Sequence, residues 1–137
     1  MKLVICEKPS VGAAVAAALG VTGKKDGYIE NDKYIISWCI GHLVQLSEAA
    51  AYGEQYRKWS YDSLPILPQE WQYTVAADKG KQFKILKDLM HRADVSEVVN
   101  ACDAGREGEL IFRFVYHQAG CKKPFARLWI SSMETDA

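Results

Sequence analysis

Near its start the chain reads Leu3-Val4-Ile5-Cys6-Glu7-Lys8-Pro9-Ser10, a short apolar run that stops at a polar string. The apolar run predicts a buried β-strand. Apolar residues then recur at helical spacing up to Leu19, and Gly20 is placed to end a helix there. A strand, a short loop and a helix form the opening of a βα unit, which favours an α/β fold.

The rest of the chain continues this alternation. Three more strands and two more helices are predicted, at 33–40, 95–102 and 125–130 and at 79–93 and 107–119. Residues 21–33 have the composition of a turn region, and residues 47–71 that of an irregular excursion. The pattern predicts a mostly parallel central sheet that helices cover on both faces. A capping-box pattern, Ser131-x-x-Glu134, predicts a further helix start.

The composition bounds the class of protein. Of the 137 residues, 49% are hydrophobic and 25% are charged, which predicts one globular domain over 1–137. Seventeen Lys and Arg balance seventeen Asp and Glu, so a nucleic-acid partner has to be sought in local patches. Neither a membrane span nor a signal peptide is predicted, and we expect a cytoplasmic protein. The cysteines lack metal-binding or paired spacing and are expected to be reduced and mostly buried: Cys6, Cys39, Cys102 and Cys121.

Two predicted strands deliver an acidic residue at their carboxyl ends, Glu7 after Cys6 and Asp103 after Cys102. Ligands of parallel sheets gather at these ends, so Glu7 and Asp103 are expected to converge, joined by Glu107. Clustered carboxylates repel unless a cation neutralises them or one stays protonated. Oxygen ligands at a phosphate-handling site suit Mg²⁺ best.

The segment Asp103-Ala104-Gly105-Arg106-Glu107-Gly108-Glu109 combines several features of a phosphate site. Its glycines allow a tight turn and a close approach of the backbone to a ligand. Arg106 offers a forked donor to phosphate, and the free N–H groups of the helix that begins near Glu107 favour an anion. A merely solvated charged turn has the same composition, but its pairing with Glu7-Lys8-Pro9-Ser10 favours the functional interpretation.

These segments, together with Ile40-Gly41-His42-Leu43 and Leu128-Trp129-Ile130-Ser131-Ser132, come in the order found in type IA DNA topoisomerases. The chain resembles the Toprim domain of bacterial enzymes of this family, most closely the topoisomerase III group. The resemblance covers essentially the whole chain. It implies a compact α/β Toprim fold, single-stranded DNA as a partner, and further domains of the same enzyme that bind DNA and carry the nucleophilic tyrosine.

The resemblance also implies roles for individual residues. Glu7 matches the acid–base group at the scissile phosphate and a metal ligand, and Lys8 matches a lysine that holds and polarises the cleaved phosphate. Asp103 and Glu107 match the first and last acids of the family's Asp-x-Asp-x-Glu metal motif. Residues matching positions near DNA phosphate are Lys8, Arg106, His42, Ser131 and Ser132.

Two departures from the family pattern bear on activity. Gly105 stands where the motif has its middle acid, so we expect one weak Mg²⁺ site that fills well only when DNA phosphate completes the ligand set. No tyrosine lies in a stretch resembling the family's nucleophile motif, so the 137 residues alone should not relax DNA. The tyrosines are expected in the core or at its rim: Tyr28, Tyr34, Tyr52, Tyr56, Tyr61, Tyr73 and Tyr116.

Some alternatives stay open at this point. A Toprim-type nuclease would hydrolyse DNA with Mg²⁺, and a metal and DNA-phosphate binding module would show no turnover. A dinucleotide-binding protein is disfavoured because no GxGxxG follows the first strand. Crowding by Asp103 would raise the pKa of Glu7, whereas Lys8 or Mg²⁺ would lower it.

Three groups of residues are interpreted as structural. The basic residues of 79–92 indicate a solvated face more than a DNA track. Leu110, Ile111, Phe114 and Val115 are predicted on the inner face of helix 107–119. Core positions are favoured for the tryptophans, which are Trp38, Trp59, Trp71 and Trp129.

Overall fold

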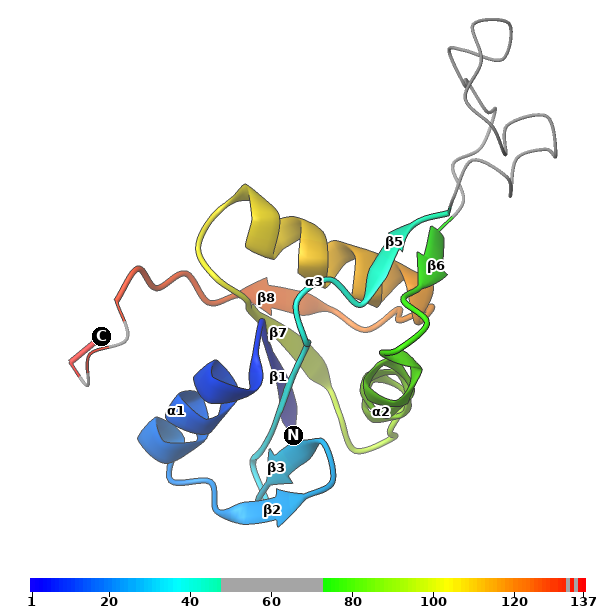
Figure 1. Cartoon of the computed structure of the whole chain (residues 1–137). Helices are drawn as coiled ribbons and strands as arrows, with labels where there is room; N and C mark the ends of the chain where they lie inside the picture. The colour runs from blue at the N-terminus through cyan, green and yellow to red at the C-terminus, as the bar shows by residue number, and fades with distance from the viewer. Residues whose placement is uncertain (48–72, 133, 135) are drawn as a thin grey trace, which may run out of the picture.

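The computed structural model describes residues 1–47, 73–132, 134 and 136–137 (Figure 1). In chain order the described elements are β1 (Lys2–Cys6), α1 (Pro9–Leu19), β2 (Gly23–Lys25), β3 (Tyr28–Glu30), β4 (Tyr34–Trp38), β5 (Val44–Leu46), β6 (Tyr73–Val75), α2 (Gly80–Met90), β7 (Glu97–Ala101), α3 (Arg106–Gln118) and β8 (Phe125–Arg127). Every strand and helix predicted from apolar periodicity is present, with ends that differ by a few residues. The helix start predicted from the capping pattern at Ser131 is not seen in the described part of that segment, which leaves out residues 133 and 135.

The main sheet has the order β2-β3-β4-β1-β7-β8. The strands β4, β1, β7 and β8 run parallel, and the central β1 aligns Cys6 with Trp38 on one side and with Ala101 on the other. The carboxyl ends of these four strands therefore lie at the same edge of the sheet. This arrangement confirms the predicted α/β fold with a mostly parallel sheet.

The antiparallel hairpin of β2 and β3 corrects the prediction of a turn region at 21–33. Each of its strands has three residues, and in the hairpin only Ile29 is buried. Strands this short and this exposed carry no periodic signal, because β2 is held by pairing with β3, and β3 by pairing with β4, instead of by an apolar face.

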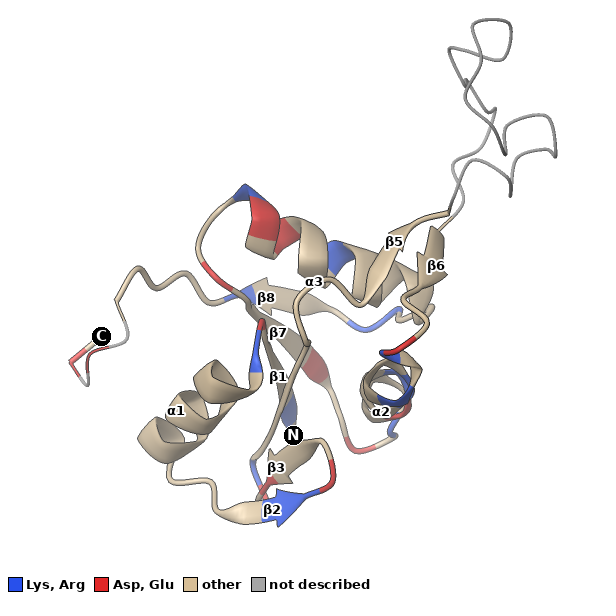
Figure 2. Cartoon of the chain, in the orientation of Figure 1, with Lys and Arg blue, Asp and Glu red and all other residues tan. Residues whose placement is uncertain are grey.

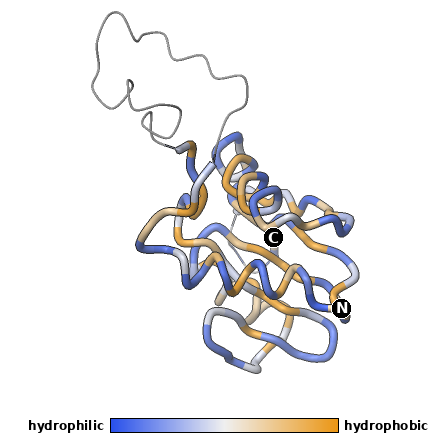
Figure 3. Tube along the Cα trace, turned by 90° about the vertical axis from the view of Figure 1, so that its right-hand side faces the viewer, coloured by the Kyte–Doolittle hydropathy of each residue, from blue (hydrophilic) through white to orange (hydrophobic). Residues whose placement is uncertain are grey.

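Helices cover both faces of the sheet, as Figure 1 shows. Alternate residues of β1 point to opposite faces. Leu3 and Ile5 pack in the core under α2 and α3, whereas Val4 and Cys6 pack under α1. In Figure 3 the hydrophobic segments of the trace lie toward the interior between these layers. Because β1 is a central strand that is buried on both faces, its sequence is a continuous apolar run.

Helix α3 buries Ile111, Phe112, Val115 and Tyr116 against the sheet. The buried face of α3 therefore differs slightly from the predicted one, because Leu110 is 43% exposed and Phe114 is only half-buried. Because the helix carries apolar residues over most of positions 110–116, periodicity alone does not fix which of them face the sheet.

The tyrosines within the described ranges occupy the expected places. Tyr28 and Tyr34 pack against the two cores and Tyr116 is buried. Tyr73 lies at the rim, with its ring centroid 5.0 Å from that of Phe114. The remaining aromatic residues of the predicted excursion lie outside the described residues: Tyr52, Tyr56, Tyr61, Trp59 and Trp71.

Two predictions for the end of the chain are wrong. Trp129 is 61% exposed instead of buried, because β8 ends at Arg127 and the following residues leave the sheet. The predicted helix start at Ser131 is absent from the described residues, where the Oγ of Ser132 accepts a hydrogen bond from the N–H of Glu134 at 3.2 Å. A short Ser–Glu pattern without an apolar stripe behind it does not sustain a helix.

The four cysteines are free and buried, as predicted. Cys6, Cys39 and Cys102 lie near one another at the ends of β1, β4 and β7, and burial raises the pKa of Cys6 to about 12. The neighbouring Cys102 thiol and burial also raise the pKa of Cys39, so the thiols of Cys6 and Cys39 favour the protonated form and pack as small apolar groups. Within the described ranges, no helix is long and apolar enough to cross a membrane.

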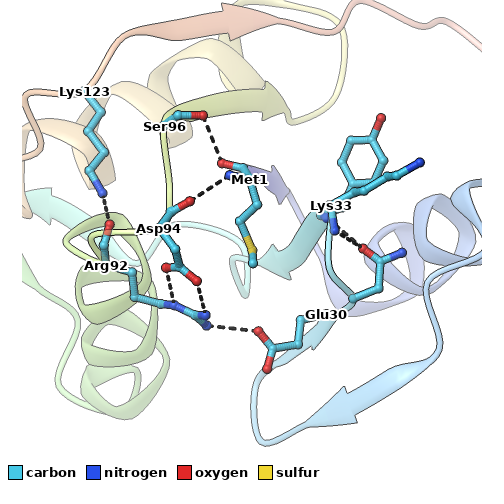
Figure 4. A network of polar contacts seen from close by, with 9 residues as sticks. Met1, Glu30, Lys33, Arg92, Asp94, Ser96 and Lys123 are labelled. Atoms are coloured by element: carbon cyan, nitrogen blue, oxygen red, sulfur yellow. Dashed lines mark hydrogen bonds and ion pairs between the residues drawn. The ribbon is translucent and has the colours of Figure 1, made fainter.

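Opposite charges are paired at the amino edge of the sheet (Figure 4). Arg92 binds Asp94 at 2.7 Å and Glu30 at 3.0 Å, and its carbonyl oxygen accepts a hydrogen bond from Lys123. The amino group of Met1 donates to the carbonyl oxygen of Asp94 at 2.7 Å. These contacts tie the hairpin, the start of β1 and the end of α2 together.

Candidate functional site

Glu7 and Asp103 meet at the carboxyl edge of the sheet, as the sequence predicted. Each follows one of two neighbouring parallel strands, and the register aligns Cys6 with Ala101. Their carboxyl groups are close enough to interact. Figure 2 shows acidic and basic segments gathering at this edge, after β1 and at the start of α3.

The environment of Glu7 favours its protonated form. Burial raises the pKa of this carboxyl above its ordinary value, and the adjoining Asp103 carboxyl raises it further, whereas Lys8 acts in the opposite direction. The Oε1 atom of Glu7 is buried and has no hydrogen-bond partner among the described residues. Of the two opposing effects left open by the sequence, crowding therefore prevails over attraction to Lys8.

Glycines shape the turn that presents Asp103. Gly105, at the N-cap of α3, has φ +146°, a conformation that residues with a Cβ rarely adopt. A Cβ at Gly108 would lie 2.1 Å from the carbonyl oxygen of Asp103, so the first turn of α3 packs directly on the Asp103 backbone. An aspartate in place of Gly105 would be strained in this backbone conformation.

Glu107 lies apart from the Glu7–Asp103 pair. Its Oε1 is 2.6 Å from the Nε2 of His42, and both side chains are exposed. Lys79 of the segment before α2 donates to the carbonyl oxygen of His42 at 3.2 Å. The structure thus brings together two of the three predicted metal ligands and pairs the third with a residue predicted to bind phosphate.

The other predicted phosphate ligands are exposed. Lys8 is exposed at the N-cap of α1 and follows Glu7 directly, and Arg106 is the exposed first residue of α3. Ser131 and Ser132 are exposed beyond the end of β8. The lysines of α2, which are Lys81, Lys84 and Lys87, are exposed as well, in agreement with a solvated basic face, and Lys81 pairs with Asp26 at 3.0 Å.

Sequence reasoning missed a polar network under the turn. Asn100 is fully buried, accepts from the N–H of Cys102 at 3.1 Å and donates to Glu109 at 3.0 Å. Arg127 of β8 reaches the same place, with its Nη1 2.9 Å from the Oδ1 of Asn100. An asparagine within an otherwise apolar strand was the available signal, because a buried amide needs partners from neighbouring strands.

The donor set of the pair fits Mg²⁺ in one particular way. Among the described residues, no group of three or more His, Cys, Asp or Glu side chains lies close enough to hold a metal ion. Protein-bound Mg²⁺, however, often uses one or two carboxylates and takes its other ligands from water and phosphate oxygens. Two adjoining carboxylates, one with an unpartnered buried oxygen, suit that arrangement.

A parallel-sheet domain with acids at its carboxyl edge, beside a glycine-containing turn and a helix N-terminus, has the features of a phosphate-handling domain. The family model of the Toprim domain matches residues 2–133, and the chain belongs to this family.

The chain is similar to bacterial proteins named DNA topoisomerase 3. It is 44% identical to that of Staphylococcus haemolyticus over 135 residues, 46% identical to that of Shouchella clausii over 136, and 44% identical to that of Bacillus subtilis over 135. These matches cover 98% or 99% of this chain but 19% of each relative. The chain thus spans about a fifth of the length of these relatives.

Proposed function

We propose that the chain is the Toprim domain of a type IA DNA topoisomerase of the topoisomerase III group, which holds the scissile phosphate of single-stranded DNA during cleavage, strand passage and religation. The observation that carries this proposal is the meeting of Glu7 and Asp103 beside Lys8, in a member of the Toprim family. The remaining domains, including the one with the nucleophilic tyrosine, belong to other parts of the same polypeptide. The 137 residues form one domain of it, and its DNA substrate places it at the nucleoid in the cytoplasm.

The raised pKa of Glu7 suits a proton-transfer role. In the cleavage step a tyrosine oxygen bonds to phosphorus, and the bond from phosphorus to the 3′ oxygen breaks. Glu7 delivers a proton to that leaving oxygen and removes it again for religation. Lys8, the next residue, stabilises the negative charge on the phosphate.

Asp103 and Glu7 are the residues that would hold Mg²⁺, and a bound ion would align the phosphate and neutralise its charge. Glu107 joins them only if it leaves His42, from which it is 2.6 Å away. In this proposal Arg106, His42, Ser131 and Ser132 bind DNA phosphates near the scissile one.

The test is a strand-cleavage and relaxation assay on the full-length protein that contains this chain. We expect Glu7→Gln to reduce cleavage by about 10²- to 10⁴-fold, the usual contribution of a general acid. Asp103→Asn should raise the Mg²⁺ concentration required and have a smaller effect on cleavage at saturating Mg²⁺. Cleavage by the Glu7 variant at the wild-type rate would contradict the proposal.

A nuclease remains the second candidate, because the same pair of acids with Mg²⁺ could activate water. The 137-residue chain alone distinguishes the two. We expect it to leave a supercoiled plasmid intact with Mg²⁺, and Mg²⁺-dependent nicking that Asp103→Asn abolishes would favour the nuclease. Binding of Mg²⁺ and oligonucleotide by an intact full-length protein without any cleavage would instead indicate a binding module.

A further inference from the structure

The guanidinium group of Arg127 donates hydrogen bonds to the backbone at the carboxyl end of β7. Its Nη1 donates to the carbonyl oxygens of Asn100 and Cys102 at 3.1 and 2.7 Å, and its Nη2 donates to the carbonyl oxygen of Asp103 at 2.8 Å. Arg127 lies opposite Asn100 in the pairing of β7 with β8. One side chain thus binds three carbonyl groups of the segment that leads from the strand to Asp103.

The carbonyl group of Cys102 in particular needs such a partner, because Cys102 is buried, whereas the carbonyl oxygen of Asn100 also accepts from the N–H of Leu128 at 2.9 Å. The strand β7 ends at Ala101, so the chain at Cys102 and Asp103 has left the ladder of the sheet. Buried carbonyl groups beyond a ladder must find other donors. The planar fork of an arginine can serve several at once, which a lysine ammonium cannot do in the same geometry.

The network also fixes Arg127 itself. Its side chain is only 21% exposed, and its Nε lies 3.5 Å from the Oε2 of Glu109, the atom that accepts from Asn100. Glu109 belongs to α3, whose first turn contacts the Asp103 backbone at Gly108. The Asp103 backbone is therefore held from two sides, by Arg127 and by α3.

The carboxyl groups of Glu7 and Asp103 repel each other when both are ionised, so the backbone at Asp103 must be held in place by other contacts. We propose that Arg127 is a positioning residue that keeps the Asp103 carboxylate beside Glu7 by binding the backbone at Cys102 and Asp103. The inference rests on the proposed function, since it assigns Arg127 to the same phosphate and Mg²⁺ site. It adds a residue that neither touches the phosphate nor belongs to the acidic motif.

The test compares Arg127→Lys with Arg113→Lys in the 137-residue chain. Arg113 is a matched control because it also pairs with Glu109, at 2.8 Å, and lies over the ring of Phe125, but it makes no contact with the turn. Mg²⁺ alone is titrated while the amide signal of Asp103 is followed by NMR. We expect Arg127→Lys to raise the Kd for Mg²⁺ about 10-fold, as for other residues that orient metal ligands, and Arg113→Lys to leave it within about twofold.

Hydrogen exchange supplies a readout that needs no metal. The N–H of Cys102 should exchange about 10-fold faster in Arg127→Lys than in wild type, while the amides of β1 keep their protection. Thermal unfolding of both lysine variants checks that a difference in Kd does not follow from a difference in stability. The lysine variant is used because Arg127→Ala leaves buried carbonyl groups without a donor and threatens the fold.

Unchanged exchange at Cys102 in Arg127→Lys would overturn the proposal, and so would an unchanged Kd for Mg²⁺. If wild type itself binds no Mg²⁺, the metal role in the proposed function fails, and the exchange at Cys102 alone then decides whether Arg127 holds the turn. Equal effects of the Arg113 and Arg127 variants on both readouts would reduce Arg127 to an ordinary stabilising residue and overturn its positioning role.

Discussion

The two edges of the parallel sheet use charge in opposite ways. At the amino edge Arg92 lies between Asp94 and Glu30 (Figure 4), and Lys2 pairs with Glu97 at 3.3 Å. At the carboxyl edge two acids, Glu7 and Asp103, face each other, and a buried oxygen of Glu7 lacks a partner among the described residues.

The difference separates a structural edge from a functional one. Paired charges lower the free energy of the folded chain, whereas adjoining like charges raise it. Proteins keep such unfavourable arrangements mainly at sites that bind or react. The carboxyl edge is therefore expected to lose function but gain stability when its acids are neutralised, and the amino edge to lose stability only.

The largest effect on stability is expected from Gly108→Ala, which disrupts the packing of α3 at the carboxyl edge. In most helix positions this change is stabilising, but here the new Cβ would meet the Asp103 carbonyl oxygen at 2.1 Å. We expect a loss of about 3 kcal/mol in the free energy of unfolding, measured by urea denaturation. Gly80→Ala at the start of α2 is the control, because its Cβ would meet nothing within 4 Å. Equal effects of the two substitutions would contradict the observed contact of α3 with the turn.

A smaller loss is expected at the amino edge from Arg92→Gln. The substitution removes charged hydrogen bonds to Asp94 and Glu30 from a partly buried position, and should cost about 1 kcal/mol in urea denaturation. Lys81→Gln breaks an ion pair with Asp26 in which both side chains are 78% exposed, and should change stability little. If the Arg92 variant is as stable as the Lys81 variant, the network of Figure 4 is not a structural clamp.

The smallest effect on stability has the opposite sign and is expected from Glu7→Gln. Because the pKa of Glu7 is raised in the folded chain, its stabilising contribution is complete below its ordinary value of 4.5 and is lost as pH rises through the higher folded value. In Mg²⁺-free buffer the melting temperature of wild type should thus fall, relative to that of Glu7→Gln, as pH rises above 4.5. Parallel melting curves over that range would show that Glu7 is not crowded by Asp103.

Much of this arrangement was predictable. The apolar run before Glu7 and the one before Asp103 indicated buried strands, and the rule for parallel sheets brought their carboxyl ends together. The place of Glu107 was not predictable, because its distance from the acidic pair depends on how the first turn of α3 is held by the glycines. Its contact with His42 depends on the path of the chain after β4, about which the spacing of polar residues says nothing.

The hairpin β2–β3 and the hydrogen bonds of Arg127 to the end of β7 could not be predicted from the sequence either. Three-residue strands lack a period, and the hairpin joins the sheet only through the pairing of β3 with β4. Arg127 and Asn100 are 27 residues apart, and only the register of β7 with β8 brings them into contact. The exposed Trp129, whose ring lies 5.0 Å from the guanidinium of Arg127, was misassigned for the same reason, since hydrophobicity does not reveal where an edge strand ends.

The sequence by itself determined the α/β class, the order of the helices and of the parallel strands, and the identity of the acids at the strand ends, because these follow from local periodicity and from the rule for parallel strands. The tertiary structure decided which acids meet, that the pKa of Glu7 is raised, and which side chains hold the turn that carries Asp103. Those properties depend on distances of a few ångströms and on burial, and both are set by contacts between segments that are far apart in the chain.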